Sequence, residues 1–104
     1  MRKEVFVINP KDNVATLVSE NGTKGRRVEA EVNGASQAFE LKDAIPFGHK
    51  FAISPIAKGA QVIKYGYSIG TATENIQPGQ HVHVHNIESN RGRGDLVKQK
   101  EKTA

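Results

Sequence analysis

The hydrophobic positions of this chain fall into short segments, and the clearest pattern lies between residues 27 and 41. Residues 27–32 (RVEAEV) alternate polar and apolar side chains, and residues 38–41 (AFEL) continue the alternation. A period of two predicts strands with one buried face, and the intervening Asn33-Gly34 favours the type I′ turn of a hairpin. We therefore expect a β-hairpin whose apolar side chains face the core and whose charged side chains face solvent.

The first part of the chain predicts two further elements. Residues 5–8 (VFVI) form an apolar run that Asn9-Pro10 closes, a pattern typical of a short strand followed by a turn. From Asp12 onward, apolar residues at positions 14, 17 and 18 lie on one side of a helix, and Asn21-Gly22 is a stop signal. We expect a short amphipathic helix capped by Asp12.

A weak internal repeat follows. Residues 56–62 (IAKGAQV) and residues 76–82 (IQPGQHV) share the pattern I-x-x-G-x-x-V. Each copy indicates an isoleucine anchor, a glycine turn and then a strand. Prolines at positions 46, 55 and 78 interrupt the chain between these strands. The pattern favours a small, irregular, mainly β domain with one or two short helices, rather than a βαβ unit.

Three of the four histidines alternate with valine in residues 81–85 (HVHVH). In a strand, His81, His83 and His85 would line one face and the two valines would line the other. Alternate residues of a strand lie about 6.5 to 7 Å apart, so two neighbouring imidazoles can converge on one metal ion, but all three can do so only if the strand bends. We expect two of them plus a group from elsewhere, for which His49 is the natural candidate. The alternative is a solvent-facing polar row opposite a valine core face.

Composition indicates one modest domain with a basic end. The chain has 104 residues, of which 37% are hydrophobic and none is tryptophan, so a partner that completes the buried surface is expected. The lack of cysteine excludes disulfides, thiolate metal ligands and a cysteine nucleophile. Residues 89–104 hold five basic and two acidic side chains, which is +3 of the net charge of +4. We therefore expect a domain at residues 1–88 and a basic, flexible tail at residues 89–104.

The same features bear on location and partners. No apolar run approaches the roughly 20 residues that span a bilayer, and the run after the basic start is too short for the core of a signal peptide. We expect a cytoplasmic protein without membrane contact. Nucleic-acid binding would depend on the tail alone, because the body has neither a concentrated basic face nor stacking aromatic residues, and it is disfavoured.

Further polar residues that could carry chemistry lie near the predicted strands. Pro46 and Gly48 frame His49 and Lys50, a pair that could bind a carboxylate or orient a metal ligand. The alternative is a bend that leaves His49 exposed. Lys64 could counter a substrate carboxylate, but a lone strand lysine is also common at a solvated edge.

The tail contains two arginines that could clamp an anionic substrate bidentately, Arg91 and Arg93. The same segment spells an arginine-glycine-aspartate tripeptide and an arginine-glycine run, but both motifs are short and occur often by chance. The chain has no nucleophile elbow, no phosphate-binding glycine loop and no convincing pair of carboxylates. A complete active site cannot be assembled from these residues alone.

The sequence resembles the N-terminal SAF-type domain of the altronate and galactarate dehydratase family through six segments in order: residues 12–15 (DNVA), 48–52 (GHKFA), 56–59 (IAKG), 62–66 (VIKYG), 69–70 (IG) and 81–86 (HVHVHN). In that family the domain either heads a long chain or forms a separate small subunit beside a large catalytic subunit, as in sulfolactate sulfo-lyase. The resemblance implies a β-clip fold. It also implies elimination of water from sugar acids or related 2-hydroxy carboxylates, with a divalent metal such as iron(II) or manganese bound by the complex.

These patterns and the resemblance together give the expected function and site. We expect the small subunit of a metal-dependent hydro-lyase acting on sugar acids such as altronate or galactarate, inactive without its large catalytic subunit; association with further copies of itself is also open. The alternative is a non-catalytic module that binds a carbohydrate or an anion. The candidate residues are His49 and Lys50 for catalysis, Lys64, Asn86, Arg91 and Arg93 for substrate binding, and His81, His83 and His85 for metal binding.

Overall fold

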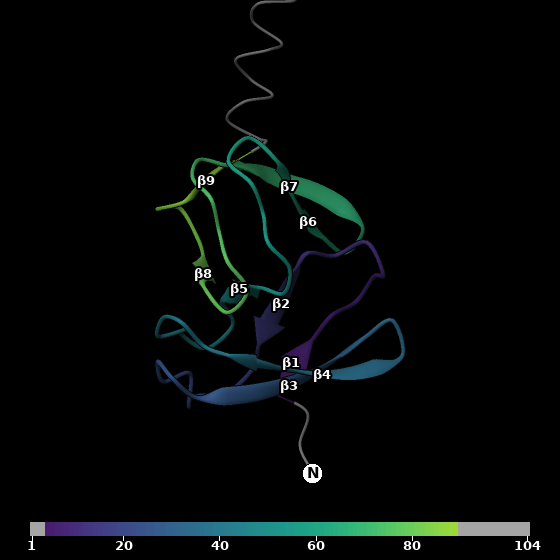
Figure 1. Ribbon diagram of the computed structural model, residues 1–104, viewed down its shortest axis with the longest axis vertical. Coiled ribbons are helices and arrows are strands. Elements are labelled where there is room, and N and C mark those ends of the chain that lie inside the picture. Colours follow the sequence, from purple (N-terminus) through teal and green to yellow (C-terminus); the bar gives the residue numbers. More distant parts are fainter. Residues whose placement is uncertain (1–3, 90–104) are drawn as a thin grey trace, which may run out of the picture.

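The computed structural model describes residues 4–89, which form nine short strands in three antiparallel sheets (Figure 1). The central sheet has the order β1-β2-β5-β8, the hairpin β3–β4 lies on one side of it, and the sheet β6-β7-β9 lies on the other. Within residues 4–89 there is no helix, and hence none that is long and apolar enough to cross a membrane. The prediction of a mainly β domain is confirmed. The strands are β1 (Val5–Phe6), β2 (Val14–Leu17), β3 (Arg27–Val32), β4 (Ala35–Glu40), β5 (Lys50–Ala52), β6 (Gln61–Lys64), β7 (Tyr67–Ala72), β8 (His81–Val82) and β9 (Ile87–Ser89).

The central sheet separates two hydrophobic cores. On the side of the β3–β4 hairpin, Leu17 and Phe51 are fully buried, and the ring of Phe39 packs edge-on against Phe51 with a centroid distance of 5.9 Å. On the side of the third sheet, Val62 and Val82 are fully buried. The central sheet is therefore covered on both faces, and it positions every element that contributes to the candidate site.

The predicted helix after Asp12 is wrong, because residues 14–17 form strand β2. Val14 faces the core of the third sheet, while Ala15 and Leu17 face the core of the β3–β4 hairpin. A strand that is buried on both faces lacks the alternation of polar and apolar residues that marks a half-buried strand. The spacing of its apolar residues therefore also fitted one face of a short helix, which is why the sequence predicted a helix here.

Asp12 and Asn13 fasten the third sheet to the central sheet. The buried carboxylate of Asp12 accepts hydrogen bonds from the backbone N–H groups of Asn9 (3.1 Å) and Gly66 (2.8 Å). The side-chain oxygen of Asn13 accepts a hydrogen bond from the N–H of Ile63 (2.7 Å), and its amide donates to a carbonyl of β6 (2.9 Å). These two polar residues therefore have a long-range role in place of helix capping.

Replacing Asp12 with alanine should lower the free energy of unfolding by about 2 kcal/mol, because two backbone N–H groups lose a charged acceptor. Equilibrium unfolding in urea, followed by circular dichroism, measures this loss. Lys11→Ala changes the exposed side chain next to Asp12 and is the control, expected to shift stability by less than about 0.5 kcal/mol. Equal losses for the two variants would contradict the anchoring role of Asp12.

The predicted β-hairpin is confirmed. Strands β3 and β4 pair from Arg27 opposite Glu40 to Val32 opposite Ala35, joined by the two residues Asn33 and Gly34. Asn33 has a φ of 53° and Gly34 a φ of 82°, as a type I′ turn requires. The Asn33-Gly34 turn signal and the alternation on either side of it were therefore sufficient to predict this hairpin.

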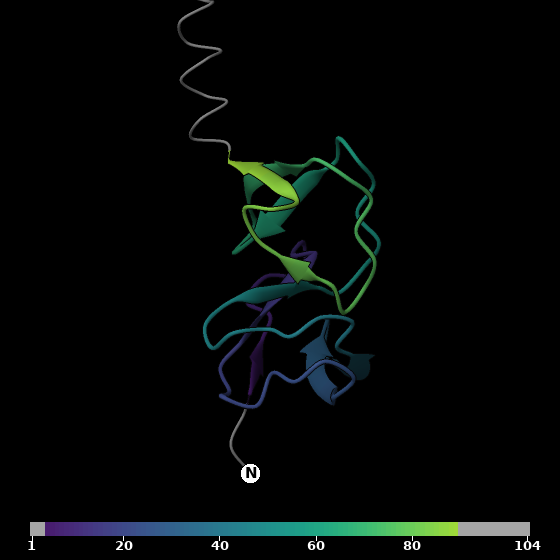
Figure 2. The same cartoon turned by 90° about the vertical axis from the view of Figure 1, so that its left-hand side faces the viewer.

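The internal repeat is visible in the structure as two loops that exchange backbone hydrogen bonds, side by side in Figure 2. Ile56 and Ile76 occupy equivalent positions and bond to each other twice, N–H to carbonyl, at 2.8 Å. The N–H of Gly59 donates to the carbonyl of Ala72, at the end of β7, and the N–H of Gly79 donates in the equivalent manner to the end of β5, both at 2.8 Å. The two copies therefore bond to each other through Ile56 and Ile76, and the glycine of each copy bonds to the end of the strand that precedes the other copy.

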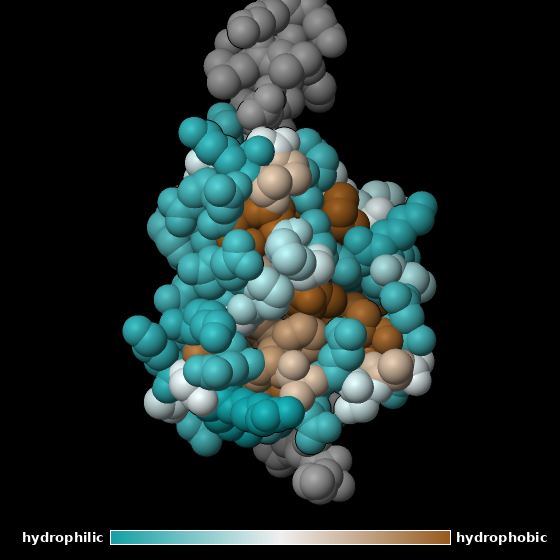
Figure 3. Space-filling view, viewed as in Figure 1, coloured by the Kyte–Doolittle hydropathy of each residue, from teal (hydrophilic) through white to brown (hydrophobic). Residues whose placement is uncertain are grey.

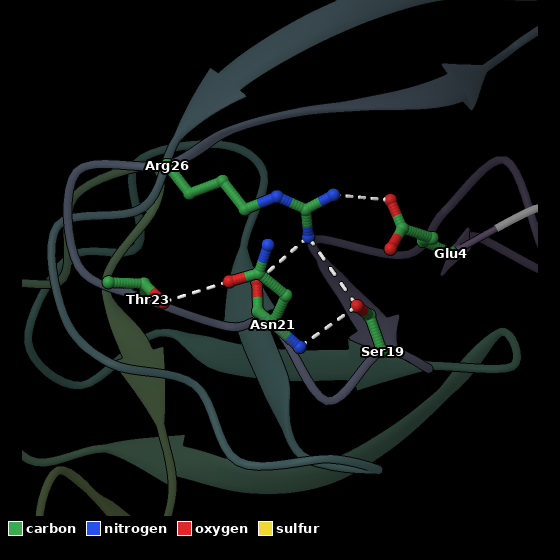
Figure 4. Close-up of polar contacts among 5 residues, drawn as sticks. All are labelled: Glu4, Ser19, Asn21, Thr23 and Arg26. Atoms are coloured by element: carbon green, nitrogen blue, oxygen red, sulfur yellow. Dashed lines mark hydrogen bonds and ion pairs between the residues drawn. The ribbon is translucent and has the colours of Figure 1, made fainter.

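Arg26 ties the loop between β2 and β3 to the residue before β1 (Figure 4). Its guanidinium pairs with the carboxylate of Glu4 at 2.5 Å and donates to the carbonyl of Asn21 (2.8 Å) and the hydroxyl of Ser19 (3.5 Å). The hydroxyl of Thr23 donates to the side-chain oxygen of Asn21 (2.9 Å). This network orders a polar loop that contains no regular strand.

Strand β9 extends the folded domain one residue beyond its predicted end at residue 88. Ser89 was assigned to the tail, but it lies in β9, and Gly70 of β7 is its partner. Residues 90–104, with the candidate substrate-binding residues Arg91 and Arg93, lie outside the described part of the chain. Their assigned role stays a prediction.

Candidate functional site

The pairing of β5 with β8 brings three histidines together at one end of the central sheet. Lys50 lies opposite Val82 in this antiparallel pair, so the same register continued by one residue sets His49 opposite His83. His81 lies on the same strand face as His83, two residues earlier. One ring nitrogen from each of the three histidines lies within 4.8 Å of the others, and all three residues are half-buried.

The rings are in direct contact. Nδ1 of His49 and Nε2 of His81 are 2.9 Å apart, so one of these nitrogens carries the proton and donates it to the other. The ring of His49 lies 4.5 Å from that of His83 between centroids, and the rings of His81 and His83 stack with 7° between their planes. His85 has its ring 5.3 Å from that of His81, but it does not belong to the group of three.

The predicted strand through residues 81–85 is wrong beyond Val82, because β8 ends there and residues 84–86 form a turn. Val82 is fully buried, whereas Val84, expected on the same core face, is 80% exposed. This bend turns His83 toward His49 and leaves His85 exposed. The expected grouping of two of these histidines with His49 is what the structure shows, and metal binding itself stays a prediction.

Asn86 fixes the backbone of two of the histidines. Its side chain is 3% exposed; the oxygen accepts a hydrogen bond from the N–H of His83 (3.0 Å), and the amide donates to the carbonyl of His81 (2.8 Å). Both polar groups of the side chain therefore have backbone partners. The sequence assigned Asn86 to substrate binding, which remains untested; its visible role is to hold the turn.

Asp43 helps to position the backbone of His81, a role that the sequence did not indicate. Its carboxylate accepts a hydrogen bond from the backbone N–H of His81 (2.9 Å), across 38 residues of chain. No motif surrounds Asp43 in the sequence, and only the folded chain brings it to β8. On the other side of the site, a turn from Pro46 with Gly48 at a φ of 80° sets the direction of His49.

His81 and His83 both have a lowered pKa. Burial, followed by the charge of His49 and the other imidazoles, lowers the pKa of His81 to about 4, and Asp43 only partly opposes this. Burial also lowers the pKa of His83, and the charges of His49 and Lys50 add to the effect. Because His81 is neutral at neutral pH, it keeps a nitrogen lone pair that can accept a proton or bind a metal ion.

Lys50 adds positive charge beside His83, and Lys64 lies close enough to Lys50 for their charges to interact. Burial lowers the pKa of Lys50, and the charge of Lys64 lowers it further. The Nζ atom of Lys64 lies 4.9 Å from the centroid of the Tyr65 ring, within the range of a cation–π contact. Within residues 4–89 neither lysine forms an ion pair with a carboxylate. Two lysines that repel each other without a carboxylate partner are suited to bind an anion.

Exposed apolar side chains adjoin the histidines along the chain. Phe47, two residues before His49, is 60% exposed, and Val84, directly after His83, is also exposed. On the face drawn in Figure 3, apolar side chains gather in the middle, between the β3–β4 hairpin and the third sheet, while polar side chains cover the rest. Small-molecule sites bury most of their ligand. The half-buried histidines are partly accessible to solvent, so they offer binding groups at the surface of the described domain.

Comparisons with known proteins place this site in a family. Residues 3–90 match the altronate/galactarate dehydratase SAF domain. The chain is 40% identical over 89 residues to (2R)-sulfolactate sulfo-lyase subunit alpha of Chromohalobacter salexigens, which covers 83% of this chain and 95% of the relative. It is 44% identical over 85 residues to altronate dehydratase of Escherichia coli and 40% identical over 88 residues to that of Bacillus subtilis, covering 80% and 85% of this chain.

The extent of these matches differs between the relatives. The chain spans nearly all of the sulfo-lyase subunit but only 16% and 17% of the two altronate dehydratases. The residues of the histidine site all lie within the matched range, and the relatives are lyases. The resemblance found in the sequence is confirmed, and the chain belongs to the altronate/galactarate dehydratase SAF domain family.

Proposed function

We propose that this chain is the small subunit of a lyase that acts on 2-hydroxy carboxylates, such as sugar acids or sulfolactate, together with a large catalytic subunit and a divalent metal. The observation that carries the proposal is the half-buried group of His49, His81 and His83 with the charge of Lys50 nearby, groups whose chemistry suits a metal ion and an anion. A second chain would supply the walls of a pocket. The match to nearly the full length of a protein named as an enzyme subunit supports this arrangement.

The chemistry of such an elimination fits the groups at the site. A base removes the proton next to the carboxylate, and the electron pair left on carbon forms the double bond while the leaving group departs from the neighbouring carbon. In a dehydratase the leaving group is a hydroxyl that takes up a proton from an acid and departs as water. Negative charge grows on the carboxylate as the proton leaves, and Lys50 and Lys64 could hold that carboxylate. A divalent metal, when bound, stabilises the same charge. Of the two expected metals, iron(II) suits imidazole ligands better than manganese does.

Purification of the tagged chain from its native cells tests the proposal. We expect a larger chain to co-purify, identifiable by mass spectrometry as a dehydratase- or sulfo-lyase-type subunit. The complex should turn over altronate, galactarate or sulfolactate with iron(II), whereas the small chain alone should not. In the complex, Lys50→Ala should lower kcat/KM at least about tenfold, because a charged contact to the substrate is lost.

Lys58→Ala is the matched control, because Lys58 is an exposed lysine in the loop between β5 and β6, which contributes no histidine to the site. It should leave kcat/KM unchanged. Recovery of the chain alone, without turnover but with binding of sugar acids, would contradict the lyase proposal. That result would favour the alternative of a non-catalytic module that binds a carbohydrate or an anion.

A further inference from the structure

We propose that His49, His81 and His83 form a metal site that this chain holds alone, and that His85 is not a ligand. The proposal deepens the proposed function, on which the physiological role of the metal rests. It follows the geometric expectation of two strand histidines plus His49, and it differs from the list of candidate residues, in which His49 was catalytic and His85 was a ligand. Binding of the metal can be measured without any turnover.

The distances between the ring nitrogens carry the proposal. Divalent ions bind imidazole nitrogen at about 2.0 to 2.1 Å, so two nitrogens that share an ion lie about 3 to 3.5 Å apart. Nδ1 of His49 and Nε2 of His81 are already 2.9 Å apart. One ring nitrogen each from His49, His81 and His83 lies within 4.8 Å of the other two, and a rotation of the half-buried His83 ring would bring its nitrogen closer.

The backbone around the three rings is fixed before any ion binds. Asp43 holds the N–H of His81, and Asn86 bridges the carbonyl of His81 and the N–H of His83. The N–H of His49 donates to the carbonyl of Pro46 (3.0 Å), and its carbonyl accepts a hydrogen bond from β2. Metal-binding histidines are usually held by such outer contacts. The backbone of each of the three ligands is therefore held by hydrogen bonds, that of His81 in strand β8 and those of His49 and His83 in the adjoining turn and bend.

The chemistry of the group points the same way. Three imidazoles in contact cannot all be protonated without mutual repulsion. The nearest acidic group, Asp43, is already engaged by a backbone N–H. A divalent cation bound to the neutral rings would use all three lone pairs. Three nitrogen ligands leave coordination positions open for water or for a substrate oxygen.

Titration of the isolated, metal-free chain with Co²⁺ tests the proposal, using calorimetry for stoichiometry and visible absorption for the coordination of the ion. We expect one ion per chain. Each of His49→Ala, His81→Ala and His83→Ala should weaken binding at least about 100-fold, because each removes a direct ligand and even outer contacts cost 10- to 100-fold. His85→Ala, the matched variant from the same turn, should change the affinity less than about threefold.

A second measurement does not depend on the variants folding. Histidine ring signals in the NMR spectrum of the unchanged chain should shift for His49, His81 and His83 when Zn²⁺ is added, but not for His85. Shifts confined to His81, His83 and His85, or an equal loss for His85→Ala and His49→Ala, would overturn the assignment. So would the absence of Co²⁺ and Zn²⁺ binding, in which case a lyase complex could still work with a metal held by the large subunit. Metal binding together with an inactive complex would refute the proposed function but not this site.

Discussion

Gly79→Ala should destabilise the domain far more than Gly59→Ala, although the two glycines occupy equivalent positions of the internal repeat. Both have a φ near +90°, where a side chain costs about 1 to 2 kcal/mol. At Gly59 an added methyl group meets no heavy atom within 4 Å, whereas at Gly79 it would lie 2.1 Å from the carbonyl oxygen of Glu40. Alanine at Gly79 therefore has to displace the end of β4 as well.

Urea unfolding of the two variants measures the difference. We expect a loss of about 1 to 2 kcal/mol for Gly59→Ala and at least about 3 kcal/mol for Gly79→Ala, the excess being the cost of overpacking. Because the backbone conformation is the same at both sites, Gly59→Ala serves as the internal control. Equal losses would mean that the end of β4 moves away from Gly79 without resistance.

Asn86→Asp should release the histidine turn while it hardly changes the shape of the side chain. The carboxylate can still accept the hydrogen bond from His83, but it cannot donate to the carbonyl of His81, which lies 2.8 Å from the present amide nitrogen. A buried acceptor then faces a charged acceptor. We expect a loss of about 2 to 3 kcal/mol in the free energy of unfolding at neutral pH, and a 10- to 100-fold loss of Co²⁺ affinity.

Asn75→Asp is the matched control for this change. The side-chain oxygen of Asn75 accepts a hydrogen bond from the N–H of Lys58 (2.9 Å), a role that aspartate keeps, and the residue is exposed. Its effect on stability should stay below about 0.5 kcal/mol. If thermal and urea unfolding show the same small effect for both variants, the two hydrogen bonds of the Asn86 side chain do not stabilise the turn.

Local patterns predicted the parts of the fold that local physics determines. Asn33-Gly34 adopts the backbone angles that only a few residue types favour, so its hairpin could be read directly. The strand at residues 14–17 could not, because burial on both faces removes the alternation that marks a strand. The role of Asp12 depends on a partner 54 residues away, which no nearby residue announces.

Some features of the candidate site could be predicted from the sequence, and others depend on contacts that form only in the folded chain. The histidine spacing and the lone His49 predicted that two imidazoles would join a third, and the register of β5 and β8 explains why. The bend after Val82 depends on Asn86, whose side chain closes the turn, so the exposure of Val84 and the departure of His85 were not foreseen. Asp43 reaches the site only through the fold of the whole chain.

The hydrogen bonds between the two loops make the folding and unfolding of this part of the domain cooperative. Ala52, the last residue of β5, bonds to the loop before β8 in both directions, and this loop and the loop after β5 also bond to each other through Ile56 and Ile76. Neither loop can unfold locally without leaving backbone groups of the other unsatisfied. The contacts join distant parts of the chain, so chain entropy is lost before they form. Strands β5 and β8, which adjoin the histidine site, should therefore form late and together during folding, and they should separate only when the whole domain unfolds.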